Sequence, residues 1–213
     1  MAIEAVIFDL DGVIVSTDKF HYKAWKALAD REGIYFDETI NNRLRGVSRM
    51  ECLNIILERS SKIYSEEQKL HLAGIKNDRY VELLKNLTQD NILQNVELVL
   101  EELQKKGIKI AIGSSSKNTK LILKHIGLGN TFEAIADGND IKRSKPFPDV
   151  FLIAAGKLGI NPKNCIVVED AEAGIQAAKS AGMTAVAIGE AVKSSEADYR
   201  LNSIDELLSL LGW

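Results

Sequence analysis

The sequence is poor in cysteine and has no long apolar run. Cys52 and Cys165 are isolated and form no CxxC pair, which favours two reduced thiols in a cytoplasmic protein. No apolar stretch approaches the length of a membrane span, so we expect no membrane association. The first residues lack the basic start and long apolar segment of a signal peptide, and residues 5–8 are predicted to form a β-strand.

The chain also lacks a dominant block of positive charge, repeats and low-complexity segments. Its 213 residues carry a formal net charge of −3, which gives no reason to expect a nucleic-acid partner. Apolar residues make up 46% and charged residues 27%, as in ordinary soluble globular proteins. The length is ample for a sizeable core and one or two domains. We expect a monomer by default.

Short apolar runs rich in β-branched residues alternate with helical patterns along most of the chain. Strands are predicted over residues 5–8, 108–112, 132–136, 165–168 and 184–188. Helices are predicted over residues 96–106, 118–125, 150–158 and 173–181, each ending at a glycine. This alternation predicts an α/β fold with a doubly wound, Rossmann-like parallel sheet covered on both faces. Ligands bind such sheets beyond the C-terminal ends of the strands.

One region breaks the alternation. Between about residues 20 and 87 the apolar residues follow helical spacing, and no convincing strand is found. These stripes are most simply core-facing. So long an insertion after the first strand predicts a small α-helical cap over the end of the sheet. We therefore predict a catalytic core of residues 1–16 and 88–213, with a cap of residues 17–87.

The strongest chemical signal follows the first strand. Asp9 and Asp11 stand two residues apart in an extended segment, so their side chains point to the same side, and Gly12 then permits a sharp turn. One carboxylate could bind a cation or act as a nucleophile while the other moves protons. Taken alone, a strand ending in an Asx-type turn is the more common explanation.

Two further signals carry groups that could bind a phosphate. One follows a predicted strand, and the other is a stiff loop. Residues 113–118 (GSSSKN) combine hydroxyls with a helix start and could cradle a phosphate, although serine is also common as a helix N-cap. Residues 144–149 (SKPFPD) place Lys145 in a loop stiffened by two prolines, where its ammonium could neutralise a phosphoryl group. A solvated lysine before a helix is the simpler alternative.

A fourth signal is Glu169 and Asp170, two acids at the end of another predicted parallel strand. Carboxylate oxygens are the ligands that Mg²⁺ prefers, although acids are also favoured at helix starts. All four signals lie on the face where a doubly wound sheet binds ligands. Together they supply a nucleophile, a proton carrier, a phosphate cradle, a cation and metal ligands. That set is complete for phosphoryl transfer.

These motifs resemble those of the haloacid dehalogenase superfamily of phosphotransferases. The matching residues, in the family's order and spacing, are Asp9, Asp11, Gly12, Ser114, Lys145, Pro146, Glu169 and Asp170. The helical insertion is similar to the small cap that this superfamily places between its first two motifs. Further segments resemble the β-phosphoglucomutase family within it: residues 21–29, 44–49, 76–78, 114–118, 134–137 and 169–177.

The resemblance implies a role for each matching residue. Asp9 would be the nucleophile and Asp11 the general acid/base, with Mg²⁺ held by Asp9, the backbone carbonyl of Asp11, and Asp170, and with Glu169 in or beside its shell. The transferring phosphoryl group would be gripped by Ser114, Ser115 and Lys145. The sugar's other phosphate would be bound by Arg49, Ser116, Lys117 and Asn118. The remaining substrate-binding residues would be His21, Trp25, Gly46, Val47, Ser48 and Lys76.

The implied reaction is an isomerisation. β-D-glucose 1-phosphate and glucose 6-phosphate would be interconverted through an aspartyl-phosphate and β-glucose 1,6-bisphosphate. The nearest alternative is a sugar-phosphate phosphatase of the same superfamily, which would admit water to the aspartyl-phosphate. A catalytically silent phosphosugar-binding protein is a further alternative, but it predicts the loss of at least one chemical residue, and all are present.

Overall fold

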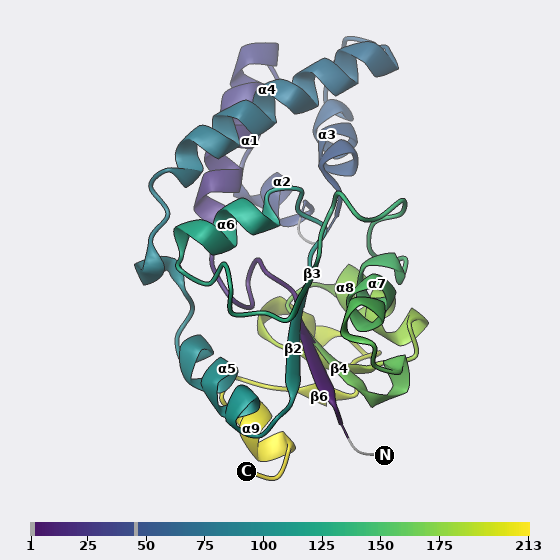
Figure 1. Cartoon of the computed structure of the whole chain (residues 1–213). Coiled ribbons are helices and arrows are strands. Elements are labelled where there is room, and N and C mark those ends of the chain that lie inside the picture. The colour runs from purple at the N-terminus through teal and green to yellow at the C-terminus, as the bar shows by residue number, and fades with distance from the viewer. Residues whose placement is uncertain (1–2, 45–46) are drawn as a thin grey trace.

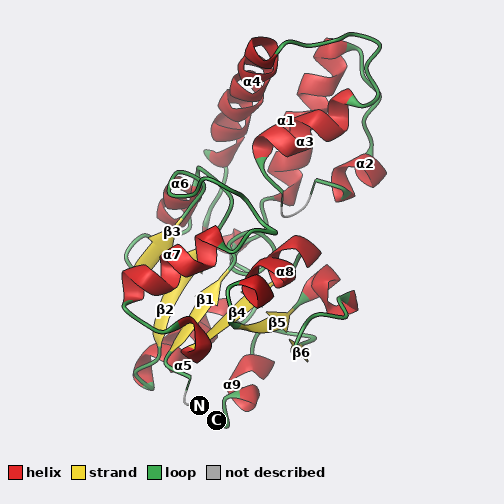
Figure 2. Ribbon diagram, turned by 90° about the vertical axis from the view of Figure 1, so that its right-hand side faces the viewer, coloured by secondary structure: helices red, strands yellow, loops and turns green. Residues whose placement is uncertain are grey.

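Six parallel strands form one sheet in the part of the chain that the computed structural model describes, residues 3–44 and 47–213 (Figure 2). The strands are β1 (Ala5–Phe8), β2 (Lys109–Gly113), β3 (Ala134–Ala136), β4 (Cys165–Glu169), β5 (Thr184–Ala187) and β6 (Tyr199–Arg200). Their spatial order is β3-β2-β1-β4-β5-β6. The winding reverses between β1 and β4, and doubly wound sheets bind ligands at such a reversal.

The predicted parallel sheet is confirmed, with one strand missed. β1 has the predicted bounds, and the other four predicted strands differ by one or two residues at their ends. β6 was not predicted. It comprises Tyr199 and Arg200, both exposed, and pairs only with β5 at the sheet edge. So short and exposed a strand carries no apolar run that a sequence pattern could reveal.

Helices cover both faces of the sheet because alternate strand residues point to opposite sides. Val6 and Phe8 of β1 belong to one apolar cluster, whereas Ala5 and Ile7 belong to the other. The core helices are α5 (Val96–Lys105), α6 (Thr119–His125), α7 (Asp149–Leu158), α8 (Glu172–Ser180) and α9 (Glu206–Leu210), with 3-10 turns η1 (Gln89–Asn91), η2 (Pro162–Asn164) and η3 (Gly189–Lys193). Helices α7 and α8 pack on one face, and α5 and α9 on the other.

The helical insertion stands above the C-terminal end of the sheet (Figure 1). It consists of α1 (Asp18–Glu32), α2 (Glu38–Asn42), α3 (Arg49–Leu57) and α4 (Glu66–Leu84). The predicted apolar stripes bury Trp25 and Leu28 of α1 against Leu53 and Ile56 of α3, in a cluster separate from those of the sheet. No described residue of this insertion lies in a strand. The insertion therefore has its own small core.

The two linkers between sheet and insertion pair with each other. The Ser16 N–H donates to the Asn91 carbonyl over 3.2 Å, and the Leu93 N–H donates to the Ile14 carbonyl over 3.0 Å. Tyr80 and Leu84, near the end of α4, pack into a core cluster of the sheet. These contacts join the base of the insertion to the sheet. None of the described helices combines the length and apolar character needed to cross a bilayer.

Candidate active site

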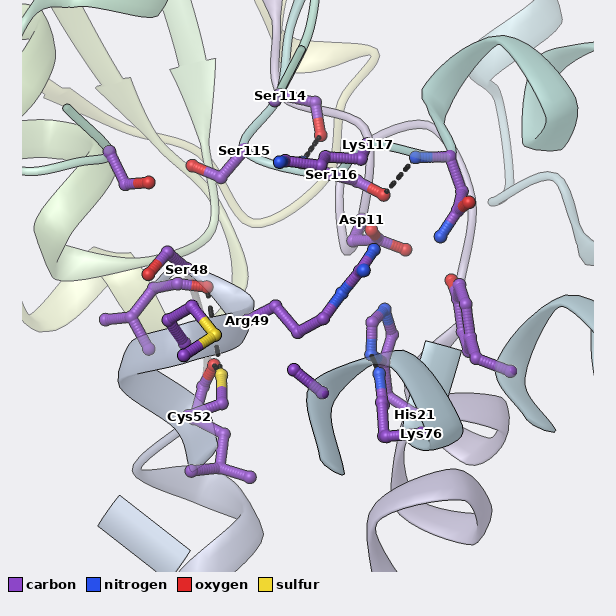
Figure 3. Close-up of a pocket in the computed structure, with 18 of the residues that line it drawn as sticks. Asp11, His21, Ser48, Arg49, Cys52, Lys76, Ser114, Ser115, Ser116 and Lys117 are labelled. Atoms are coloured by element: carbon purple, nitrogen blue, oxygen red, sulfur yellow. Dashed lines mark hydrogen bonds between the residues drawn. The ribbon is translucent and has the colours of Figure 1, made fainter. Parts of the chain in front are cut away.

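A cavity of about 500 Å³ lies between the helical insertion and the C-terminal ends of the strands (Figure 3). Fifteen of the predicted site residues line it: Asp9, Asp11, His21, Trp25, Val47, Ser48, Arg49, Lys76, Ser114, Ser115, Ser116, Lys117, Asn118, Lys145 and Asp170. Glu169 is fully buried and does not line the cavity wall. Gly46 lies outside the described residues. The fold thus brings segments far apart in the sequence to one cavity.

Asp9 is held at the end of β1 by a buried lysine. The Asp9 N–H continues the ladder to β4 by donating to the Val168 carbonyl over 3.0 Å. The Lys145 ammonium, whose side chain is 1% exposed, donates to Asp9 Oδ1 over 2.5 Å and to Glu169 Oε2 over 2.8 Å. Burial alone would lower the pKa of Lys145, but the two carboxylates outweigh burial and raise that pKa above its usual value. Lys145 therefore stays charged and orients Asp9.

Three carboxylates converge beside this lysine. One oxygen each from Asp9, Glu169 and Asp170 lie within 4.8 Å of one another. Burial and the charge of Asp9 raise the pKa of Glu169, as expected where negative charge exceeds positive. Oxygen donors with a surplus of negative charge suit a hard divalent cation such as Mg²⁺. The residues present therefore fit the predicted metal.

Two glycines allow this convergence. A Cβ on Gly12 would lie 2.1 Å from Asp170 Oδ2, and the backbone there has a φ of +84°. A Cβ on Gly174 would lie 2.0 Å from the Glu169 carboxyl carbon. Any side chain at either position would displace an acid of the cluster. The glycine of the first motif is thus explained by the approach of Asp170 as well as by the turn.

The Asp11 carboxylate belongs to a different network. Its Oδ1 accepts a hydrogen bond from the Thr17 hydroxyl, which in turn accepts one from the Tyr80 hydroxyl over 3.1 Å. Burial raises the pKa of Asp11 to about 7, although the Thr17 hydrogen bond acts in the opposite direction. A carboxyl with a pKa near neutrality can both donate and accept a proton at physiological pH. Asp11 is therefore suited to acid/base work.

We expect Asp11→Asn to stabilise the protein at pH 8. The folded state holds the Asp11 proton more tightly than the unfolded state does, so stability falls as pH rises from about 4 to about 7. Asparagine keeps an acceptor for Thr17 but never ionises. Urea unfolding without added metal should show a gain on the order of 2 kcal/mol at pH 8 and little at pH 4. Exposed Asp90→Asn is the control; an equal gain at both pH values would contradict the burial argument.

The half-buried His21 and the buried Lys76 form a pair on the cap side of the cavity. Lys76 Nζ lies 2.9 Å from His21 Nδ1, and 4.6 and 4.5 Å from the ring centroids of Trp25 and Tyr80. Burial lowers the pKa of Lys76 to about 7 and, helped by the charges of Lys76 and Arg49, holds the pKa of His21 well below its usual value. A neutral His21 accepts the hydrogen bond from Lys76. The cap therefore carries one positive charge here, on Lys76, and this charge is lost as the pH rises through about 7.

Arg49 reaches into the cavity from the first residue of α3 (Figure 3). The Ser48 hydroxyl caps that helix by accepting from the Glu51 N–H over 3.3 Å. Ser48 therefore fixes the point from which Arg49 extends, whatever contact it also makes with a substrate. Burial lowers the pKa of Arg49 from its usual value. Its guanidinium remains a planar fork of donors suited to a phosphate.

Opposite Arg49 lies a tight turn after β2, formed by residues 114–118 and called here the 114–118 turn. The Ser114 hydroxyl accepts from the Ser116 N–H over 3.1 Å, and the Ser116 hydroxyl accepts from the Asn118 N–H over 3.2 Å. The buried Ser115 hydroxyl has no hydrogen-bond partner among the described residues, which suits a site that takes up a polar ligand. The Asn118 amide donates to Asn77 Oδ1 of α4 over 2.9 Å, joining core to cap.

Sequence reasoning missed several residues of the site. Thr17 and Tyr80 carry the network of Asp11, but Tyr80 stood in a stripe assigned to the core, where it is indeed 1% exposed. Cys52, Gly74 and Lys142 also line the cavity. No local motif marks them, because the cavity arises from the meeting of two parts of the chain.

Comparisons with known proteins agree with this geometry. The sequence model of the haloacid dehalogenase-like hydrolases matches residues 3–182. The β-phosphoglucomutase of Bacillus subtilis is 41% identical over 206 residues, covering 96% of this chain and 91% of that protein. A fructose-1-phosphate phosphatase of Escherichia coli is 31% identical over 183 residues, covering 85% of this chain and 94% of that protein.

A solved structure extends the likeness to three dimensions. The crystal structure of β-phosphoglucomutase from Clostridium difficile superposes with a TM-score of 0.92 at 41% identity, covering 99% of this chain and 97% of that one. The family match covers most of the chain and includes the segments that carry Asp9, Ser114, Lys145 and Asp170. The chain belongs to the haloacid dehalogenase-like hydrolase family.

Proposed function

We propose that this protein interconverts β-D-glucose 1-phosphate and glucose 6-phosphate. The observation that carries the proposal is the presence, in one cavity, of two sets of anion-binding groups. Lys145, which bonds Asp9, forms the first set with Ser114 and Ser115 of the 114–118 turn. The second set is Arg49, which approaches from the cap, with Ser116, Lys117 and Asn118 of the same turn. A phosphatase needs one phosphate site, whereas a mutase that passes through a bisphosphate needs two. The relatives named β-phosphoglucomutase support the same choice of sugar.

Asp9 is the nucleophile in this proposal. Its carboxylate oxygen bonds to phosphorus as the bond from phosphorus to the sugar oxygen breaks, and Asp11 gives its proton to the departing oxygen. Lys145, Ser114 and Ser115 stabilise the charge on the transferring group. The phosphoaspartate then phosphorylates β-D-glucose 1-phosphate: the 6-hydroxyl attacks phosphorus and gives its proton to Asp11 while the bond from phosphorus to Asp9 breaks, which forms β-glucose 1,6-bisphosphate. Asp9 next takes the phosphoryl group from carbon 1 of this bisphosphate, which releases glucose 6-phosphate and restores the phosphoaspartate.

The metal site belongs to the same proposal. Asp9, Asp170 and the backbone carbonyl of Asp11 would hold Mg²⁺, with Glu169 beside it. When bound, the ion supplies positive charge that offsets the carboxylates and the phosphoryl group. Lys145 bonds Glu169 as well as Asp9, so Glu169 also serves to hold the lysine in place. This dual contact gives Glu169 a role even where it does not touch the metal.

We also propose that residues 1–16 and 88–213 act as the catalytic core and residues 17–87 as a cap. The cap contributes His21, Trp25, Val47, Arg49 and Lys76 to the cavity, and the core contributes the reacting groups. Enclosure by the cap would keep water from the phosphoaspartate. Exclusion of water would favour transfer to the sugar over hydrolysis, and so a mutase over a phosphatase.

Arg49→Ala is expected to damage mutase turnover more than hydrolysis of a simple phosphate ester. The bisphosphate loses a charge-assisted contact to its second phosphate, whereas a monoester without that phosphate loses nothing. We expect kcat/KM for glucose phosphate conversion to fall about 30-fold or more, the equivalent of about 2 kcal/mol. Ester hydrolysis should change less than about threefold, within the range of a peripheral change.

Arg79→Ala is the matched control for that experiment. Arg79 also lies in the cap but is half-exposed, pairs with Glu82 and does not line the cavity. Its replacement should leave both activities unaltered. Equal losses of mutase and ester activity in Arg49→Ala would remove the case for a second phosphate site on the cap, and would favour the phosphatase alternative.

A further inference from the structure

Helix α4 has a glycine in its interior, at a point where it lines the active-site cavity. Gly74 lies near the middle of the helix (Glu66–Leu84) and is half-buried. Glycine destabilises a helix interior relative to alanine because its backbone loses more conformational freedom on folding. A glycine at such a position therefore needs a reason in its surroundings.

Other glycines near the cavity have such a reason, and Gly74 does not. Gly12 and Gly174 give room to buried acids, and a Cβ on Gly138 would lie 2.4 Å from the Ser115 carbonyl oxygen. A Cβ on Gly74 would meet no heavy atom of the described residues within 4 Å, and the backbone there is not left-handed. Neither close packing nor backbone geometry requires glycine at this position. What glycine provides at position 74 is open space.

That space faces the core. Leu70 lies one turn before Gly74 and Asn77 almost one turn after it, so the three share a face of α4. Leu70 lines the cavity and is 63% exposed, while Asn77 accepts the hydrogen bond from Asn118 in the 114–118 turn. Gly74 therefore leaves α4 without a side chain between two positions that look toward the core.

We propose that Gly74 is a specificity-determining residue, whose missing side chain leaves room for the ring of a hexose phosphate against α4. The substrate class rests on the function proposed above. Phosphoryl transfer itself occurs at Asp9, on the core side, so a donor with no sugar ring does not need the space beside α4. A side chain at position 74 thus acts against the ring and not against the transfer step.

The test compares two donors in size-graded variants. Gly74→Ala and Gly74→Leu are paired with Gly156→Ala and Gly156→Leu. Gly156 is an exposed glycine inside α7 that does not line the cavity, and a Cβ there would also meet no atom of the described residues within 4 Å. Both alanine variants should raise Tm by about 1–3 °C, which shows that they fold. Acetyl phosphate serves as the small donor, and its reaction is measured as the rate of phosphoenzyme formation.

The expected result is a loss of selectivity. In Gly74→Leu the ratio of kcat/KM for glucose phosphate to that for acetyl phosphate should fall at least about tenfold, with a smaller fall in Gly74→Ala. Both Gly156 variants should keep the wild-type ratio. An unchanged ratio in Gly74→Leu, or equal losses with both donors, would overturn the proposal. Should the wild type release phosphate from hexose phosphates without isomerising them, the mutase proposal fails, and the same ratio still tests Gly74.

Discussion

Replacing Asp9 with asparagine is expected to abolish formation of a phosphoenzyme. Asparagine has nearly the same shape but lacks the charged oxygen that bonds to phosphorus and that Lys145 orients at the end of β1. Turnover of glucose phosphate should fall by at least about 10³-fold. Rapid acid quenching after incubation with a radiolabelled phosphate donor, followed by gel electrophoresis, measures the covalent label directly.

The control for this variant is Asp30→Asn. Asp30 is an exposed residue of α1 that pairs with Lys26 and does not line the cavity. It should label and turn over like the wild type. Normal labelling of Asp9→Asn would mean that another residue is the nucleophile, and the assignment of the first motif would then be wrong.

The second large effect is expected from Lys145→Met, on the free energy of unfolding. Methionine fills a similar volume but leaves Asp9 and Glu169 buried without their ammonium partner. Breaking a buried ion pair from one side costs about 3–5 kcal/mol, because the remaining charge is uncompensated. We therefore expect the free energy of unfolding in urea, without added metal, to fall by about 3 kcal/mol at pH 7.

A second substitution separates charge from packing. Adding Glu169→Gln to Lys145→Met removes one uncompensated charge, so part of the lost stability should return. The surface pair of Lys193 and Glu190 gives the matched control, because Lys193→Met should change stability by less than about 1 kcal/mol. If Lys145→Met were as mild as Lys193→Met, the buried network would not hold Asp9 in the way described.

The sequence was sufficient to predict the parts of the fold that have a strong local pattern. The buried strands β1 and β4 read as continuous apolar runs because helices cover both of their faces. The edge strand β6 has only two exposed residues and no such pattern. The acidic motifs could be placed together because the ends of parallel strands meet at one edge of the sheet, whichever strand order the chain adopts.

The cap side of the site was harder to derive from local patterns. Tyr80 lies in an apolar stripe, yet its hydroxyl supports Thr17, which in turn bonds Asp11. Gly74 carries no side chain that a motif could include. The contact of Tyr80 with Thr17 joins segments more than fifty positions apart, as does the pairing of His21 with Lys76. Their assignment required the relative placement of α1, α3 and α4 over the sheet.

The most direct test of the central claim is a phosphorus NMR time course of the purified protein. The sample contains Mg²⁺, β-D-glucose 1-phosphate and a trace of glucose 1,6-bisphosphate. The account predicts conversion mainly to glucose 6-phosphate, with little inorganic phosphate, because Asp9 passes its phosphoryl group to a second hydroxyl of the sugar in a cavity closed to water. Release mainly of inorganic phosphate would contradict it and would make the protein a sugar-phosphate phosphatase.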